Sequence, residues 1–174
     1  MTALAQYYVP GRYIEDHAID VPLDWRGDTP GKTVSGETIR LFYRVVCEAG
    51  HEQEDLPLLL FLQGGPGGAG PRPMGHDGGD AWLAEALKHF RVVLPDQRGT
   101  GRSSRIDSHA MRRIEGAPAQ AEYLKRFLAD SIIRDFEHLR LTAFGGRKWV
   151  TLGQSYGGFL TLSYLSLFPQ GLAA

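Results

Sequence analysis

The sequence predicts an α/β fold built on a mostly parallel sheet with flanking helices, and three observations support this prediction. Short apolar segments alternate along the chain with segments of helical spacing, as strands and crossover helices do. Residues 57–63 and 90–96 are apolar runs typical of strands that are buried on both faces. The glycines, 22 of 174 residues, are concentrated between Gly64 and Gly79 and in three later clusters, which indicates specialised turns.

The N-terminal third predicts an antiparallel beginning to the sheet. Residues 12–22 and 38–47 have the composition of strands, and a loop rich in Gly, Pro and Asp separates them. The run at 57–63 is then the first central strand, and a glycine-rich loop ends it.

The rest of the chain continues the alternation. A helix is expected over residues 81–89, followed by the second central strand at 90–96. Helical spacing from 119 to 142, with a break near Asp130, predicts the next crossover. A strand at 148–154 leads into a segment at 156–168 that is apolar almost all round, and we expect this segment to be a buried helix.

Composition limits the classes of partner. The chain has 19 basic and 20 acidic residues and a net charge of -1, so nothing in it favours nucleic acid or an anionic membrane. The first 13 residues lack a basic patch followed by an apolar stretch, and no apolar run approaches the length of a bilayer. We therefore expect a cytoplasmic protein that acts on small substrates.

The first chemical motif is G-x-S-x-G at residues 153–157, between a predicted strand and a predicted helix. In this context the pattern is a nucleophile elbow, a sharp turn that exposes a serine hydroxyl at the carboxyl end of a strand. Glycines are needed on both sides because larger side chains would collide with the neighbouring strand or helix. Ser155 is therefore the candidate nucleophile.

The second motif is QGGPGG at residues 63–68, directly after the first central strand. Glycines at this place let backbone N–H groups approach a substrate oxyanion. Gly64 is the preferred donor and Gly65 the second choice, and the N–H of Tyr156 would complete the oxyanion hole. A phosphate-binding loop fits less well, because the glycine patterns of nucleotide sites do not occur and Pro66 lacks an N–H. No cofactor is expected.

The third motif, DQRGTGRS at residues 96–103, makes a family resemblance specific. With QGGPGG and GQSYGG, in this order and at these separations, it resembles the proline iminopeptidase group of α/β-hydrolases over about residues 38–170. That family commonly has HGGPG in the first loop, so Gln63 is a departure. For Asp96 and Arg98 we favour a role in holding the loop over direct catalysis.

The resemblance implies a serine aminopeptidase that releases N-terminal proline or small residues from peptides through an acyl-enzyme on Ser155. Two alternatives stay open. An esterase or another acyl hydrolase could use the same scaffold, because neither the fold nor the elbow determines the leaving group. A non-catalytic scaffold, or a subunit completed by another chain, is the second alternative.

The chain lacks part of what the resemblance requires. In α/β-hydrolases the acid and the histidine of the triad follow the serine, yet no acidic residue and no histidine follows Ser155. Six histidines precede it, and each is expected at the surface: His17, His51, His76, His89, His109 and His138.

We therefore expect residues 1–174 to form a partial catalytic domain, with antiparallel strands at about 12–47 and a core at about 57–170. The later strands and the helical cap of the family would be absent. The strand at 149–154 would then be an exposed edge that pairs with a complementing C-terminal part or with another copy. The chain alone is expected to be almost inactive.

Overall fold

The computed structural model describes residues 2–74 and 81–173. Within these residues one six-stranded sheet has the order β1-β2-β3-β5-β4-β6. The strands are β1 (Ala5–Val9), β2 (Arg12–Pro22), β3 (Thr38–Glu48), β4 (Leu58–Leu62), β5 (Arg91–Pro95) and β6 (Trp149–Gly153). The helices are α1 (Ala81–Leu87), α2 (Ser108–Arg112), α3 (Ala117–Lys125), α4 (Ala129–Ala143), α5 (Tyr156–Leu167) and the short 3-10 helix η2 (Pro169–Gly171).

The sheet changes from antiparallel to parallel at its centre. Strands β1, β2 and β3 pair antiparallel, and β3 also runs antiparallel to β5. Strand β4 lies between β5 and β6 and is parallel to both. The carboxyl ends of these three strands therefore share one edge of the sheet, where open α/β sheets bind their ligands. The predicted α/β fold with an antiparallel beginning is confirmed.

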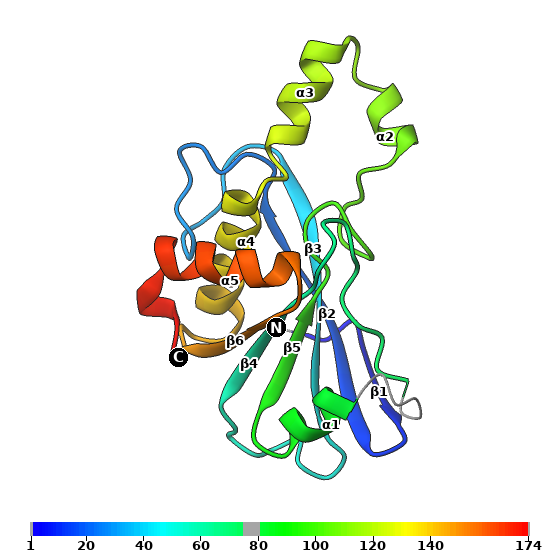
Figure 1. Cartoon of the computed structure of the whole chain (residues 1–174), viewed down its shortest axis with the longest axis vertical. Helices are drawn as coiled ribbons and strands as arrows, with labels where there is room; N and C mark the ends of the chain where they lie inside the picture. Colours follow the sequence, from blue (N-terminus) through cyan, green and yellow to red (C-terminus); the bar gives the residue numbers. More distant parts are fainter. Residues whose placement is uncertain (1, 75–80, 174) are drawn as a thin grey trace.

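Helices cover both faces of the sheet (Figure 1). Helices α4 and α5 lie over one face, and α1 lies against the other. Along β4 the side chains alternate between the two cores: Leu58, Leu60 and Leu62 face α4 and α5, whereas Leu59 and Phe61 join the core that includes α1. All five residues of β4 are buried, which confirms that this strand is covered on both faces.

Helices α2 and α3 form an arm that extends away from the sheet (Figure 1). None of the residues in these two helices is buried. The interrupted helix expected over residues 119–142 consists of two helices, α3 and α4. The break between them covers residues 126–128. The short elements β1 and α2 were not predicted. No helix in the described part of the chain has both the length and the apolar character needed to cross a membrane.

The expectation that the helix at 156–168 is buried on all sides was wrong. Helix α5 buries only Gly157, Leu160 and Tyr164, on the side that packs against α4, β4 and β6. Its opposite side exposes large apolar side chains: Phe159 (55%), Leu162 (66%), Leu165 (53%) and Leu167 (40%). When a helix is apolar on every side, its sequence does not indicate which side is covered, because burial depends on the neighbouring elements.

Strand β6 is an edge strand, as predicted, because among the described strands it pairs only with β4. The residues after η2 pair with the first residue of its other side. Leu172 forms an isolated parallel bridge with Trp149, and the N–H of Ala173 donates to the carbonyl of Trp149 at 3.0 Å. The free side of β6 therefore accepts a parallel partner at its amino end.

Two of the histidines that were expected at the surface are buried. His17 is buried and stacks on Tyr43, with ring centroids 5.1 Å apart. His138 is buried on α4, where its Nδ1 accepts a hydrogen bond from the N–H of Gly31 at 3.0 Å. Burial lowers the pKa of His138, which favours the neutral ring that this bond requires. The expectation failed because a helix or strand assignment does not tell which face is covered.

The other described histidines are not buried. Within the described residues the side chains at positions 51, 89 and 109 are exposed or partly exposed and interact with local polar groups. His76 lies outside the described residues.

A buried ion pair joins the loop after β5 to helix α4. The guanidinium of Arg98 binds both carboxylate oxygens of Asp135 at 2.5 and 2.6 Å, and both side chains are fully buried. Trp25 Nε1 donates to the same carboxylate at 2.8 Å, and Arg98 also donates to the carbonyls of Pro22 and Arg126. Arg98 thus holds the loop after β5 against three segments that are distant in sequence.

Replacing Asp135 by Asn is expected to cost about 3–5 kcal/mol of folding free energy, because Arg98 would stay buried without a counter-charge. Urea unfolding monitored by tryptophan fluorescence measures this loss. Glu122→Gln, which breaks the exposed pair with Lys125, serves as the control and should leave the midpoint unchanged. Equal midpoints for both variants would contradict the anchoring role of Arg98.

Candidate active site

Ser155 occupies the sharp turn between β6 and α5. Its backbone has φ 55° and ψ -118°, and it is the only non-glycine residue with positive φ in the described part of the chain. Such a conformation is costly for an L-residue and persists only where surrounding contacts impose it. Here the N–H of Gln154 donates to the carbonyl of Leu62 at 3.1 Å, and the N–H of Gly157 donates to the carbonyl of Gln154 at 2.8 Å. The serine is exposed.

The two glycines of the motif are required by close backbone contacts. A Cβ atom at Gly157 would overlap the carbonyl oxygen of Leu62, at the end of β4. A Cβ atom at Gly153 would overlap the carbonyl oxygen of Gly157. The spacing G-x-S-x-G therefore fits a strand and a helix that approach each other too closely for any side chain.

The loop after β4 lies directly against this turn. A Cβ atom at Gly64 would be 2.9 Å from the carbonyl oxygen of Gln154 and 3.0 Å from the Cβ of Ser155. Gly64 is buried, whereas Gly65 is exposed. The structure thus brings together the two motifs that the sequence analysis assigned to one site.

Two of the predicted oxyanion donors differ in their hydrogen bonding. Within the described residues, the N–H of Tyr156 at the beginning of α5 donates to no acceptor. The N–H of Gly64 instead donates to the side-chain oxygen of Gln63, with Oε1 at 2.8 Å. Burial and the carboxylate of Asp130 raise the pKa of Tyr156, so its phenol is neutral near pH 7. The catalytic roles of Ser155, Gly64 and Tyr156 remain predictions.

The third motif supports the loop through hydrogen bonds. The fully buried carboxylate of Asp96 accepts from the N–H of Gly70 at 2.7 Å and from Arg72 Nη2 at 2.9 Å. Gln97, also buried, donates from Nε2 to the carbonyl of Gln63 at 2.8 Å. Asp96 therefore holds the loop, as favoured from the sequence. The contact of Gln97 was missed, because composition gives no signal of which loop a buried amide will reach.

A general base is not found near Ser155 in the described part of the chain. The hydroxyl of Ser155 has no hydrogen-bond partner there, and each described histidine contacts groups elsewhere. The described residues also contain no cluster of side chains suited to a metal ion. The described residues therefore place an exposed serine hydroxyl on a strained turn, and activation of this hydroxyl would require a base that they do not supply.

A pocket of about 510 Å³ adjoins the turn. It is lined by Phe61, Gln63, Pro71, Trp82, Leu152, Gly153 and Gln154. Trp82 stacks on Phe61 with ring centroids 4.4 Å apart, which gives the pocket an apolar wall. Its polar lining comes from the loop after β4 and from the residues that precede Ser155, so the pocket has room for a small acyl or peptide group beside this serine.

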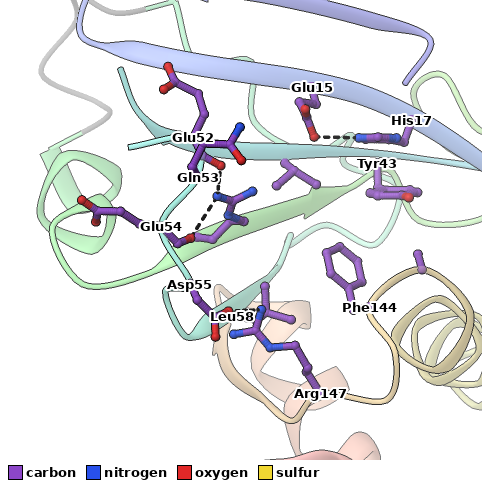
Figure 2. Close-up of a pocket in the computed structure, with 13 residues that line it drawn as sticks. Glu15, His17, Tyr43, Glu52, Gln53, Glu54, Asp55, Leu58, Phe144 and Arg147 are labelled. Carbon is purple, nitrogen blue, oxygen red and sulfur yellow. Dashed lines mark hydrogen bonds and ion pairs between the residues drawn. The ribbon is translucent and has the colours of Figure 1, made fainter. Parts of the chain in front are cut away.

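Another pocket, of about 460 Å³, lies at the opposite end of the parallel strands (Figure 2). Its lining includes Leu58 and Arg91, the first residues of β4 and β5. Arg91 donates to the carbonyl of Glu52 at 2.5 Å, and Arg147 pairs with Asp55 at 2.9 Å, so both arginines hold the surrounding loop. This pocket is separate from the serine turn.

The close contact at Gly157 predicts opposite effects for neighbouring substitutions. Gly157→Ala should lower the free energy of unfolding by at least about 2 kcal/mol, because the new methyl would force β4 and α5 apart. Gly158→Ala is the matched control, since no atom lies within 4 Å of a Cβ there, and it should raise stability by up to about 1 kcal/mol. Thermal unfolding followed by circular dichroism measures both, and a destabilised Gly158→Ala protein would contradict this account.

Comparison with known proteins agrees with this geometry. A family model described as the alpha/beta hydrolase fold matches residues 57–174. The chain is 43% identical over 172 residues to a proline iminopeptidase of Aeromonas sobria, covering 99% of this chain and 38% of that protein. It is 37% identical over 185 residues to a proline iminopeptidase of Aspergillus aculeatus, covering 98% of this chain and 40% of that protein.

The chain thus spans about two-fifths of the length of these relatives. Among solved structures, a hydrolase from Pseudomonas aeruginosa superposes with a TM-score of 0.54 at 24% identity, over 80% of this chain and 42% of that one. The strand order, the turn at Ser155 and the matching family model lead to one conclusion: the chain belongs to the α/β-hydrolase fold family.

Proposed function

We propose that this chain carries the nucleophile half of a serine aminopeptidase that releases N-terminal proline or another small residue from peptides in the cytoplasm. The observation that supports this proposal best is the position of Ser155, which is exposed, has a positive φ and lies beside the buried Gly64. Similarity to two proline iminopeptidases over almost the whole chain supports the substrate class. No cofactor is needed for this chemistry.

In the proposed mechanism Ser155 Oγ attacks the scissile carbonyl carbon while a histidine accepts its proton. The carbonyl oxygen gains negative charge, which the N–H groups of Tyr156 and Gly64 stabilise. The peptide nitrogen then takes the proton from the histidine and leaves. Water attacks the acyl-enzyme in the same way and releases the N-terminal residue. The histidine and its orienting carboxylate come, in this proposal, from polypeptide that is not part of these 174 residues.

We also propose that further polypeptide covers the free side of β6 and the exposed face of α5. The occupant would be a C-terminal complement or another copy of the chain. The parallel bridge between Trp149 and Leu172 supports pairing on the free side of β6. The exposed Leu162 and Leu165 on α5, together with Leu152 on β6, support a cover over the same region.

The activity is tested with protein expressed from the complete reading frame. We expect cleavage of proline β-naphthylamide, and Ser155→Ala should reduce kcat by at least about 10⁴-fold because the acyl-enzyme cannot form. Ser163→Ala is the control, since among the described residues this hydroxyl binds only the carbonyl of Phe159 on the same helix, and it should leave kcat unchanged. Hydrolysis of p-nitrophenyl acetate without cleavage of the naphthylamide would favour the esterase alternative.

The 174-residue chain alone is expected to react poorly with a fluorophosphonate probe, because no described residue activates the hydroxyl of Ser155. Intact-mass spectrometry after incubation measures the extent of labelling. Complete labelling of Ser155 within minutes would contradict the need for a base from other polypeptide.

A further inference from the structure

The side chain of Gln63 occupies a hydrogen bond that the proposed oxyanion hole needs. Its Oε1 accepts from the N–H of Gly64 at 2.8 Å, and its Nε2 donates to the carbonyl of Ala69 at 3.2 Å. Gln63 thus binds both ends of the glycine loop that faces Ser155. An amide N–H has one proton, so Gln63 and a substrate oxyanion compete for the same donor at Gly64.

We propose that Gln63 gates the oxyanion hole: its side chain closes the Gly64 donor in the free protein and rotates away when a substrate binds. This inference depends on the proposed function, because it assumes attack by Ser155. It adds a regulatory group at the same site, namely an internal acceptor that each substrate must displace.

The surroundings determine which part of the loop can move. The backbone of Gln63 is held by the buried Gln97, whose Nε2 donates to the carbonyl of Gln63 at 2.8 Å. The loop is held again at Gly70, whose N–H donates to the buried carboxylate of Asp96. The side chain of Gln63, in contrast, is half-buried, lines the pocket beside the serine turn and is held by two hydrogen bonds. Rotation of this side chain is therefore easier than movement of the backbone.

Gating makes a prediction that a merely supporting role does not. If Gln63 competes with substrate, a residue of similar length that is only a weak hydrogen-bond acceptor should open the hole. Gln63→Met should therefore raise the second-order rate of fluorophosphonate labelling about three- to tenfold, the effect of one net hydrogen bond. Gln63→Glu keeps an acceptor and adds charge beside the developing oxyanion, so labelling should be at least about tenfold slower.

The experiment uses protein from the complete reading frame and follows fluoride release, as Ser155 Oγ bonds to phosphorus and the P–F bond breaks. Faster labelling of Gln63→Met than of wild type supports the gate. Slowing of both variants to a similar extent overturns it, because each has lost the bond to Ala69 and a support role predicts equal damage. Absence of labelling in both wild type and Gln63→Met refutes the proposed function and the gate together.

A second measurement examines the bond without catalysis. In the Ser155→Ala protein labelled with ¹⁵N-glycine, the Gly64 amide proton should move upfield when Gln63 is replaced by Met, because it loses its acceptor. An unchanged resonance would overturn the gate even if the enzyme is active. Thermal unfolding of each variant verifies that the fold is retained.

Discussion

The contact between the end of β4 and the beginning of α5 is the constraint on which the site depends. The carbonyl of Leu62 receives the N–H of Gln154 and leaves no room for a side chain at Gly157. These contacts bend the chain so abruptly that Ser155 adopts positive φ. Backbone atoms, which vary little with sequence, thus create the local geometry, and the motif is the set of residues that tolerates it.

Much of the fold could be predicted because its signals are local. The apolar run of β4 and the glycines that follow it indicate a buried strand and its turn without knowledge of any neighbour. The boundaries of β2 agree with the prediction, and those of β4 and β6 differ by one residue at each end. The approach of Gly64 to Ser155 also followed from the sequence, because loops after parallel strands share one edge.

The features that sequence reasoning missed depend on contacts between distant segments. The burial of His138 requires the loop that contains Gly31, and the exposure of Leu162 depends on what lies beside α5. The departure at Gln63 was visible in the sequence, but its effect on Gly64 required side-chain geometry. Local patterns predict elements and turns, whereas the environment of a single side chain depends on the assembled layers.

The central position of β4 has a consequence for synthesis on the ribosome. Both of its sheet neighbours, β5 and β6, are translated after it, and β6 follows only after the whole arm and α4. Before β5 is translated these five consecutive apolar residues have neither of their native strand partners, and until β6 follows they have only one. Nascent chains with such a strand are prone to associate with one another, so folding in the cell is expected to depend on chaperones that bind extended apolar segments.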